Sequence, residues 1–276
     1  MILSVANTTQ GRGKMTETRQ NEATPINSRT QIGIVLDRSG SMGSIASDTI
    51  GGFNQFIKDQ KETEGDVTLT LVQFDDQYEI LKDMEPIASV ADLDGTTYVP
   101  RGGTALLDAI GKTINRVEHQ ISELSEDNKP NKVIFVIITD GEENASREFS
   151  KDNVFEMIRR HESENNWQFV FIGANQDAIA EAGGMGIRAA SSLSYGANAG
   201  GVRAMYTSMS RNMTTYRTAS DSESYAFCAE DRAAQEDHGV VTQKVSDDQP
   251  KELDPEDSAP EEPEDLAFYH TKSSTK

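Results

Sequence analysis

The chain has little cysteine, few positive charges and no long hydrophobic run. Cys228 is the single cysteine among 276 residues, so no disulfide forms within the chain and nothing requires an oxidising compartment. No apolar run approaches the ~20 residues of a membrane-spanning helix. Residues 1–6 are apolar, but they lack the basic region and the length of a signal peptide. These absences predict a cytoplasmic protein that does not contact a membrane.

The charge is strongly acidic and unevenly placed. The chain has 46 Asp and Glu against 26 Lys and Arg, a net charge of −20, which disfavours general electrostatic binding to nucleic acid or an anionic membrane. Residues 221–276 hold 16 acidic and 5 basic residues, a net charge of −11, which leaves −9 for the rest. The exclusion of nucleic acid is therefore weaker for the rest of the chain.

Both ends of the chain are polar and without periodicity. We predict a disordered extension over residues 1–29, in which Met15 offers an alternative translation start, and a largely disordered acidic tail over residues 220–276. The tail ends in an apolar island, Leu266-Ala267-Phe268-Tyr269, which either stays solvated or docks on a surface. A tail carboxylate could also cap a metal site elsewhere in the chain.

Residues 30–219 carry the patterns of a folded domain. Short apolar runs predict buried strands at residues 31–36, 67–74, 133–138 and 168–172, with a hairpin partner at 78–81 and a weak strand at 187–190. Helical spacing predicts helices over residues 45–57, 105–121, 149–161 and 198–217, with a short one from Asp177 and Asn198 as a cap. The alternation predicts a doubly wound α/β, Rossmann-like fold with a mostly parallel sheet.

Three predicted loops at the carboxyl ends of the strands carry oxygen-bearing side chains. Asp37, Ser39 and Ser41 follow the first strand, Thr104 precedes the long helix, and Asp140 follows the most apolar strand. Ligands of open α/β sheets bind at this edge. Two carboxylates and three hydroxyls are hard donors that suit Mg²⁺, with Mn²⁺ or Ca²⁺ as alternatives.

This pattern resembles the von Willebrand factor A family and its metal-ion-dependent adhesion site. The family's motif is Asp-x-Ser-x-Ser, then a Thr, then an Asp, and Asp37, Ser39, Ser41, Thr104 and Asp140 match it in order. The flanking sequences are similar to those of bacterial and phage members, which would place the protein in a host cytoplasm or a virion. The resemblance covers residues 30–217.

The resemblance implies a fold and a function. It implies a six-stranded sheet of order 3-2-1-4-5-6 with the hairpin strand antiparallel at one edge. Ser39, Ser41 and Thr104 would be the direct or nearly direct metal ligands, and Asp37 and Asp140 would hold metal-bound waters. The metal would accept an Asp or Glu from a protein partner, so the chain would be an adaptor with no catalytic residue. Five neighbouring residues could support the metal ligands or form a partner rim, meaning a surface around the metal that contacts the partner: Arg38, Arg101, Gly103, Glu142 and Glu143.

Two other functions remain open on the sequence. A structural or assembly role in a phage particle or a large cytoplasmic complex is compatible with the same domain. A Mg-dependent phosphotransferase of the haloacid-dehalogenase type would also place Asp37 after the first strand. Such enzymes need a second acid two residues later, and that position is Ser39. The sequence does not predict the oligomeric state.

Overall fold

The computed structural model describes residues 29–174, 178–219 and 224–241. The predicted disorder of residues 1–29 and the apolar island at 266–269 fall outside these residues, apart from Arg29. A six-stranded sheet of order β3-β2-β1-β4-β5-β6 forms the centre, and only the β2–β3 pair is antiparallel. The predicted fold and strand order are confirmed. The strands are β1 (Arg29–Asp37), β2 (Asp66–Phe74), β3 (Tyr78–Pro86), β4 (Lys132–Thr139), β5 (Gln168–Ala174) and β6 (Ser192–Tyr195).

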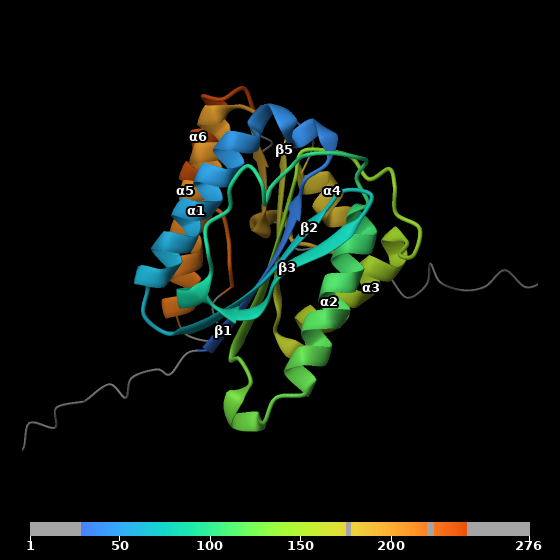
Figure 1. The fold of residues 1–276 in the computed structure, drawn as a ribbon, viewed down its shortest axis with the longest axis vertical. Helices are drawn as coiled ribbons and strands as arrows, with labels where there is room; N and C mark the ends of the chain where they lie inside the picture. The colour runs from blue at the N-terminus through green and yellow to red at the C-terminus, as the bar shows by residue number, and fades with distance from the viewer. Residues whose placement is uncertain (1–28, 175–177, 220–223, 242–276) are drawn as a thin grey trace, which may run out of the picture.

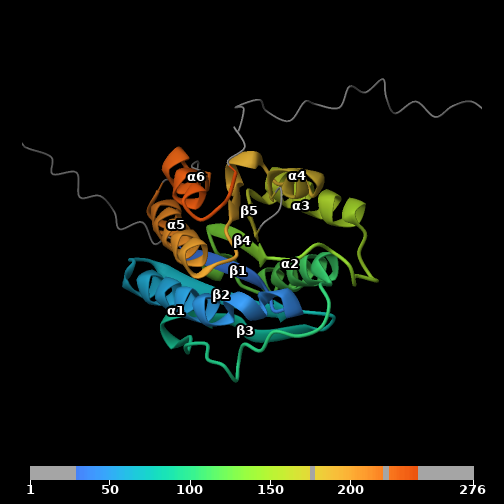
Figure 2. The same cartoon turned by 90° about the horizontal axis from the view of Figure 1, so that it is seen from above.

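Helices cover both faces of the sheet (Figures 1 and 2). One face carries α1 (Ala46–Glu62), α5 (Ala199–Thr218) and α6 (Ala229–Glu236), and the other carries α2 (Leu106–Ser122), α3 (Lys151–Asn165) and α4 (Ala178–Gly184). Because side chains alternate along a strand, Ile34 and Leu36 pack under α1 and α5 while Val35 packs under α2. The near-continuous apolar runs of the sequence reflect burial on both faces.

Local signals define most element ends. Asn198 caps α5 as predicted, because its side chain accepts the Gly201 amide at 3.0 Å. The predicted helix from Phe149 instead begins at Lys151, where Ser150 and Asn153 form a reciprocal capping box. Phe149 packs over Gly111 of α2.

Two predicted boundaries were wrong. The weak strand placed at residues 187–190 lies at Ser192–Tyr195, because residues 189–191 form a short 3-10 turn before the chain pairs with β5. The prediction of a largely disordered tail from residue 220 is wrong for residues 224–241, which pack on the domain and contain α6. Tyr225 and Phe227 are buried there, and the Phe227 amide donates to the Ala190 carbonyl at 2.9 Å. Tyr225 and Phe227 hold this segment on the domain, although its overall acidic composition predicts disorder.

Candidate metal site

The carboxyl ends of the parallel strands face the viewer in Figure 2, and three loops meet there. The loop after β1 is tied to the loop before α2, since the Gly40 amide donates to the Gly102 carbonyl at 3.2 Å and the Arg101 amide to the Arg38 carbonyl at 2.8 Å. The loop after β4 joins them because the Asn144 amide donates to the Thr104 carbonyl at 3.0 Å. Backbone hydrogen bonds therefore hold three segments distant in sequence at one place.

The five predicted ligands lie together at this junction. The Ser39 and Ser41 hydroxyls are 2.9 Å apart, and the Ser41 hydroxyl donates to Asp140 Oδ1 at 2.6 Å. Asp37 Oδ1 accepts the Ser39 amide at 2.6 Å. The Thr104 hydroxyl lies close to Gly141. A Cβ added to Gly141 would be 3.0 Å from Thr104 Oγ1 and 3.4 Å from Ser41 Oγ. The hydroxyls thus converge on a small space beside Gly141.

In the part of the chain that the structure describes, the two carboxylates lack a positive partner. Asp37 is fully buried, and burial raises its pKa to about 6 despite the hydrogen bonds from Thr139 and Ser39. Burial also raises the pKa of Asp140. Within residues 29–241 as described, no ion pair with Lys, Arg or His involves either carboxylate. A cation bound here would supply the missing charge.

The donor set fits a hard divalent cation. Among the described residues there is no group of three or more His, Cys, Asp and Glu that could hold a metal. The two carboxylates must therefore be completed by hydroxyls, and Ser39, Ser41 and Thr104 provide them. An all-oxygen set with few charges suits Mg²⁺, which retains several waters.

Three residues that support the site were not assigned this role from the sequence. The Thr139 hydroxyl donates to Asp37 Oδ2 at 2.6 Å, and the Tyr98 hydroxyl donates to the Asp37 carbonyl at 2.6 Å. The Asn144 side-chain oxygen accepts the Thr104 amide at 2.9 Å. Thr139 and Asn144 lie close to Asp140 in the sequence, so their roles could have been predicted from that proximity. Tyr98 comes from a long loop whose path no local pattern predicts.

Arg38 does not form a partner rim. Its side chain is 5% exposed and makes ion pairs with Asp75 at 3.0 Å and with Glu79. Arg101 shares the same Asp75 carboxylate at 2.8 Å, but its side chain is 51% exposed. Burial opposes ionisation of Asp75, yet the bonds from Arg101 and the Gln77 amide and the charge of Arg38 lower its pKa. The prediction that Arg38 faces a partner was wrong, because β2 places a buried carboxylate beneath it; Arg101 remains accessible.

The other three predicted neighbours of the site, Glu143, Glu142 and Gly103, differ in what they contact. Glu143 accepts the Leu107 amide at 3.0 Å and the Ala145 amide at 2.9 Å, so it stabilises the start of α2 and the loop that carries Asn144. Glu142 is exposed. Gly103 allows a close approach, since a Cβ there would lie 3.0 Å from Asn144 Oδ1.

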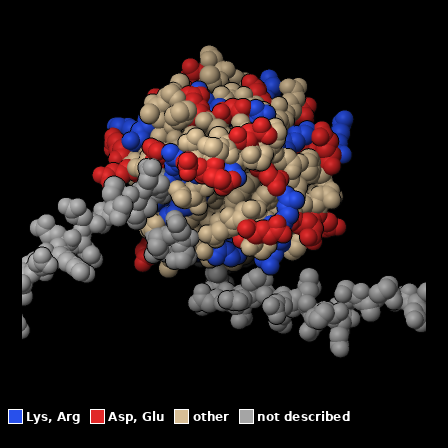
Figure 3. All heavy atoms as spheres, turned by 90° about the horizontal axis from the view of Figure 1, so that it is seen from below, with Lys and Arg blue, Asp and Glu red and all other residues tan. Residues whose placement is uncertain are grey.

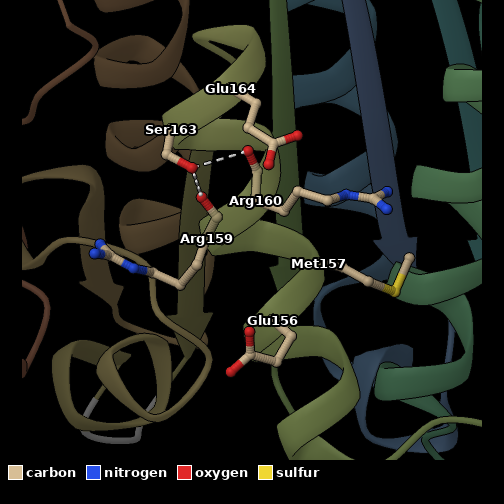
Figure 4. Close-up of a pocket in the computed structure, with 6 residues that line it drawn as sticks. All are labelled: Glu156, Met157, Arg159, Arg160, Ser163 and Glu164. Atoms are coloured by element: carbon tan, nitrogen blue, oxygen red, sulfur yellow. Dashed lines mark hydrogen bonds between the residues drawn. The ribbon is translucent and has the colours of Figure 1, made fainter.

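A hollow on α3 shows no comparable convergence (Figure 4). Its Arg159 and Arg160 side chains extend to opposite sides of the helix. The Ser163 hydroxyl donates back to the carbonyls of Arg159 and Arg160, at 2.9 and 3.1 Å. The described residues that line this hollow all belong to α3, so polar groups of several elements do not meet there.

Comparison with known proteins gives one family match and several structural ones. Residues 32–142 match the family model of the von Willebrand factor type A domain. No curated protein matches the chain significantly. The pilus adhesin SpaC of Lactobacillus rhamnosus GG, in its open conformation, is 10% identical with a TM-score of 0.52, over 68% of this chain and 30% of that chain.

Two further structures are similar at lower scores. A von Willebrand factor type A protein of Catenulispora acidiphila is 12% identical with a TM-score of 0.48, over 68% of this chain and 43% of that chain. Proximal thread matrix protein 1 of the mussel byssus, with zinc in its metal site, is 16% identical with a TM-score of 0.47, over 68% of this chain and 46% of that chain. The chain thus spans less than half of each of these proteins.

The helices of the described residues include none that is long and apolar enough to cross a membrane. The matched residues 32–142 contain all five predicted ligands. They match a von Willebrand factor type A domain in sequence, and the described residues have the six-stranded α/β fold of one.

Proposed function

We propose that the domain binds Mg²⁺, or a similar divalent cation, and uses it to hold a carboxylate of a protein partner. One observation carries the proposal: three hydroxyls converge with Asp140 beside Gly141, while Asp37 and Asp140 have no positive partner among the described residues. By resemblance to the family, Ser39, Ser41 and Thr104 would bind the metal directly, and Asp37 and Asp140 would act through water.

The neutral hydroxyls explain why the bound cation would attract a partner. They donate electron density without cancelling charge, so a bound metal keeps much of its positive charge. An Asp or Glu side chain from a partner can then complete its coordination. The exposed Arg101 lies in the loop before Thr104 and adds a second positive group on this face. We place this adaptor in a bacterial cytoplasm or in a phage particle, as the flanking sequences suggest.

Calorimetric titration with Mg²⁺ or Mn²⁺ tests the metal site. The double variant Ser39→Ala with Ser41→Ala is expected to weaken binding by at least ~10-fold, since it removes two donors. Ser44→Ala is the matched control, because Ser44 is an exposed serine in the same turn and makes none of the site's bonds. Equal affinities for the double variant and the control would refute the site.

A pull-down from the native source tests the adaptor role. A partner retained in Mg²⁺, lost in EDTA and lost in the double variant supports it. Retention in EDTA instead favours the assembly role. Among the described residues, acidic and basic side chains are interspersed on the opposite end of the molecule (Figure 3), which is not the continuous basic surface that binds nucleic acid.

The phosphotransferase alternative finds no support in the geometry. Ser39 stands where such an enzyme needs its general acid, and its hydroxyl lies 2.9 Å from the Ser41 hydroxyl. Release of phosphate from a simple phosphomonoester, abolished by Asp37→Asn, would revive this alternative. We expect no such release.

A further inference from the structure

Two buried tyrosine hydroxyls near the candidate metal site have no hydrogen-bond partner among the residues that the structure describes. They belong to Tyr195, the last residue of β6, and to Tyr206 of α5. Both side chains are almost fully buried and pack in the apolar cluster on the face of the sheet that α1 and α5 cover (Figure 2). A buried hydroxyl without a partner is costly, so each of the two calls for a group that completes it.

The register of the sheet places Tyr195 in line with Asp140. Tyr195 is opposite Ala174 of β5. Thr139 of β4 is opposite the residue that precedes Ala174, and Asp140 directly follows Thr139. Tyr195, Ala174 and Asp140 therefore form one row across three neighbouring strands, about 10 Å long because strands lie ~4.8 Å apart. Ala174 packs in the same cluster as Tyr195, and its small side chain leaves the middle of the row open to the long tyrosine side chain.

Electrostatic effects on Tyr195 agree with this placement. Burial raises the pKa of Tyr195, and the negative charge of Asp140 raises it further, ahead of Tyr206 and Asp37. Such an effect requires proximity, because the interaction between charges falls with distance. Asp140 can accept a further hydrogen bond. Its side chain accepts one from the Ser41 hydroxyl, and a carboxylate has about four acceptor positions.

Tyr206 approaches the same place from α5. Burial raises the pKa of Tyr98, and the next cause of that rise is the neighbouring Tyr206. The Tyr98 hydroxyl itself donates to the Asp37 carbonyl at 2.6 Å, so Tyr98 marks the inner side of the site. Gly52 of α1 fixes the Tyr206 ring, because a Cβ added there would overlap it. The hydroxyls of Tyr195 and Tyr206 are thus both held near the inner side of the site.

We propose that one buried water joins the hydroxyls of Tyr195 and Tyr206 to the Asp140 carboxylate, which makes both tyrosines positioning residues of the metal site. This inference rests on the proposed function. A buried water makes about three hydrogen bonds to polar groups that otherwise lack partners, and this set supplies three such groups. Held on its inner side, Asp140 keeps Oδ1 directed at Ser41 and at the cation beside Gly141.

Calorimetric titration of the full chain with Mn²⁺ tests the proposal. Tyr195→Phe and Tyr206→Phe each remove one hydroxyl and keep the ring. We expect each variant to bind Mn²⁺ about 10-fold more weakly, as is usual when a group that orients a metal ligand is lost. Tyr225→Phe is the matched control. The Tyr225 hydroxyl is also buried without a partner among the described residues, but its charged neighbour is Asp231 of α6, so Mn²⁺ affinity should not change.

Thermal melts in EDTA separate positioning from a general structural role. Without metal, the melting temperatures of Tyr195→Phe and Tyr206→Phe should change no more than that of Tyr225→Phe, because none of the three substitutions removes a hydrogen bond between described residues. A larger fall in either variant would assign that tyrosine to the stability of the fold and overturn its positioning role.

The titrations also distinguish this inference from the proposed function. Equal Mn²⁺ affinities of the natural chain and Tyr195→Phe would overturn the inference and leave the metal site in place. A loss in Tyr195→Phe but not in Tyr206→Phe would overturn the shared water. If the natural chain binds neither Mn²⁺ nor Mg²⁺, the proposed function fails, and this inference fails with it.

Discussion

Gly141 stands at the centre of the site, and its missing side chain matters more than its flexibility. It is not among the glycines with positive φ, so alanine fits its backbone. The added methyl would lie 3.0 Å from Thr104 Oγ1, 3.4 Å from Ser41 Oγ and 3.7 Å from Ser39 Oγ. A methyl group at this position would therefore fill the space that we propose for the cation.

Gly141→Ala is therefore expected to weaken divalent-metal binding by ~10-fold or more, because the methyl displaces the hydroxyls that would bind the metal. The melting temperature should change little. Calorimetric titration and a thermal melt measure the two effects. Gly43→Ala is the control, since its Cβ would meet nothing within 4 Å in the adjacent turn. Undiminished affinity in Gly141→Ala would place the metal elsewhere.

Asn144 acts on the site through Thr104 and is a positioning residue. Asn144→Ala removes the acceptor of the Thr104 amide, so the Thr104 hydroxyl loses its fixed place. We expect a loss of ~10-fold in metal affinity, as is usual for groups that orient ligands. Glu142→Gln is the control, because Glu142 is exposed two residues earlier in the same loop. An undiminished affinity in Asn144→Ala would show that the placement of Thr104 does not depend on this hydrogen bond.

At the scale of elements, the α3–β5 connection depends on a buried histidine. His161 near the end of α3 stacks on Trp167 with ring centroids 4.0 Å apart, and its Nδ1 lies 3.1 Å from Asn165 Oδ1. Burial lowers the pKa of His161, although the charge of Glu118 opposes this. The folded state therefore favours the neutral ring.

This preference predicts a pH dependence of stability. Above the ordinary histidine pKa of 6.5, the ring is neutral in both folded and unfolded chains and contributes no pH dependence. Below it, the unfolded chain takes up a proton more readily, so stability falls as pH falls, by at most about 1.4 kcal/mol per pH unit. Urea unfolding at pH 7.5 and 5.5 should show a larger loss for the natural chain than for His161→Phe, which keeps the stacking. Equal losses would show that His161 protonates freely in the fold.

At the scale of the whole molecule, residues 224–241 complete the domain. Arg232 donates from Nη1 to the Ser192 carbonyl at 2.8 Å and from Nη2 to the Ala189 carbonyl at 2.9 Å, next to the edge strand β6. Gln235 Nε2 donates to the Gly201 carbonyl at 3.2 Å and so reaches the start of α5. The segment thus protects a sheet edge that would otherwise be open to other chains.

Truncation tests this boundary. A chain that ends at residue 219 is expected to lose about 3–6 kcal/mol of unfolding free energy, the burial energy of two aromatic side chains, Tyr225 and Phe227. A chain that ends at residue 241 should keep a cooperative transition near that of the full chain. Denaturant unfolding of the three lengths measures this. Equal stability of the 219 and 241 forms would return residues 224–241 to the tail.

Local chemistry was enough to predict most of the sheet and the candidate ligands. Runs such as residues 133–138 are apolar throughout, and only a strand buried on both faces explains them. Asp37, Ser39, Ser41 and Asp140 follow such strands, and Thr104 precedes the helix α2. Because parallel strands end at one edge, the topology alone brings them together.

Packing between distant segments decided the rest. Arg38 turns inward because Asp75, 37 residues later, is buried beside it. Tyr98 donates a hydrogen bond to Asp37 from a loop without periodicity. Residues 224–241 fold because Tyr225 and Phe227 are buried against the domain. Apolar periodicity along the chain reports what each segment must bury. It does not show which distant residue will contact a single charged side chain or aromatic ring. That contact is determined only when the segments pack together.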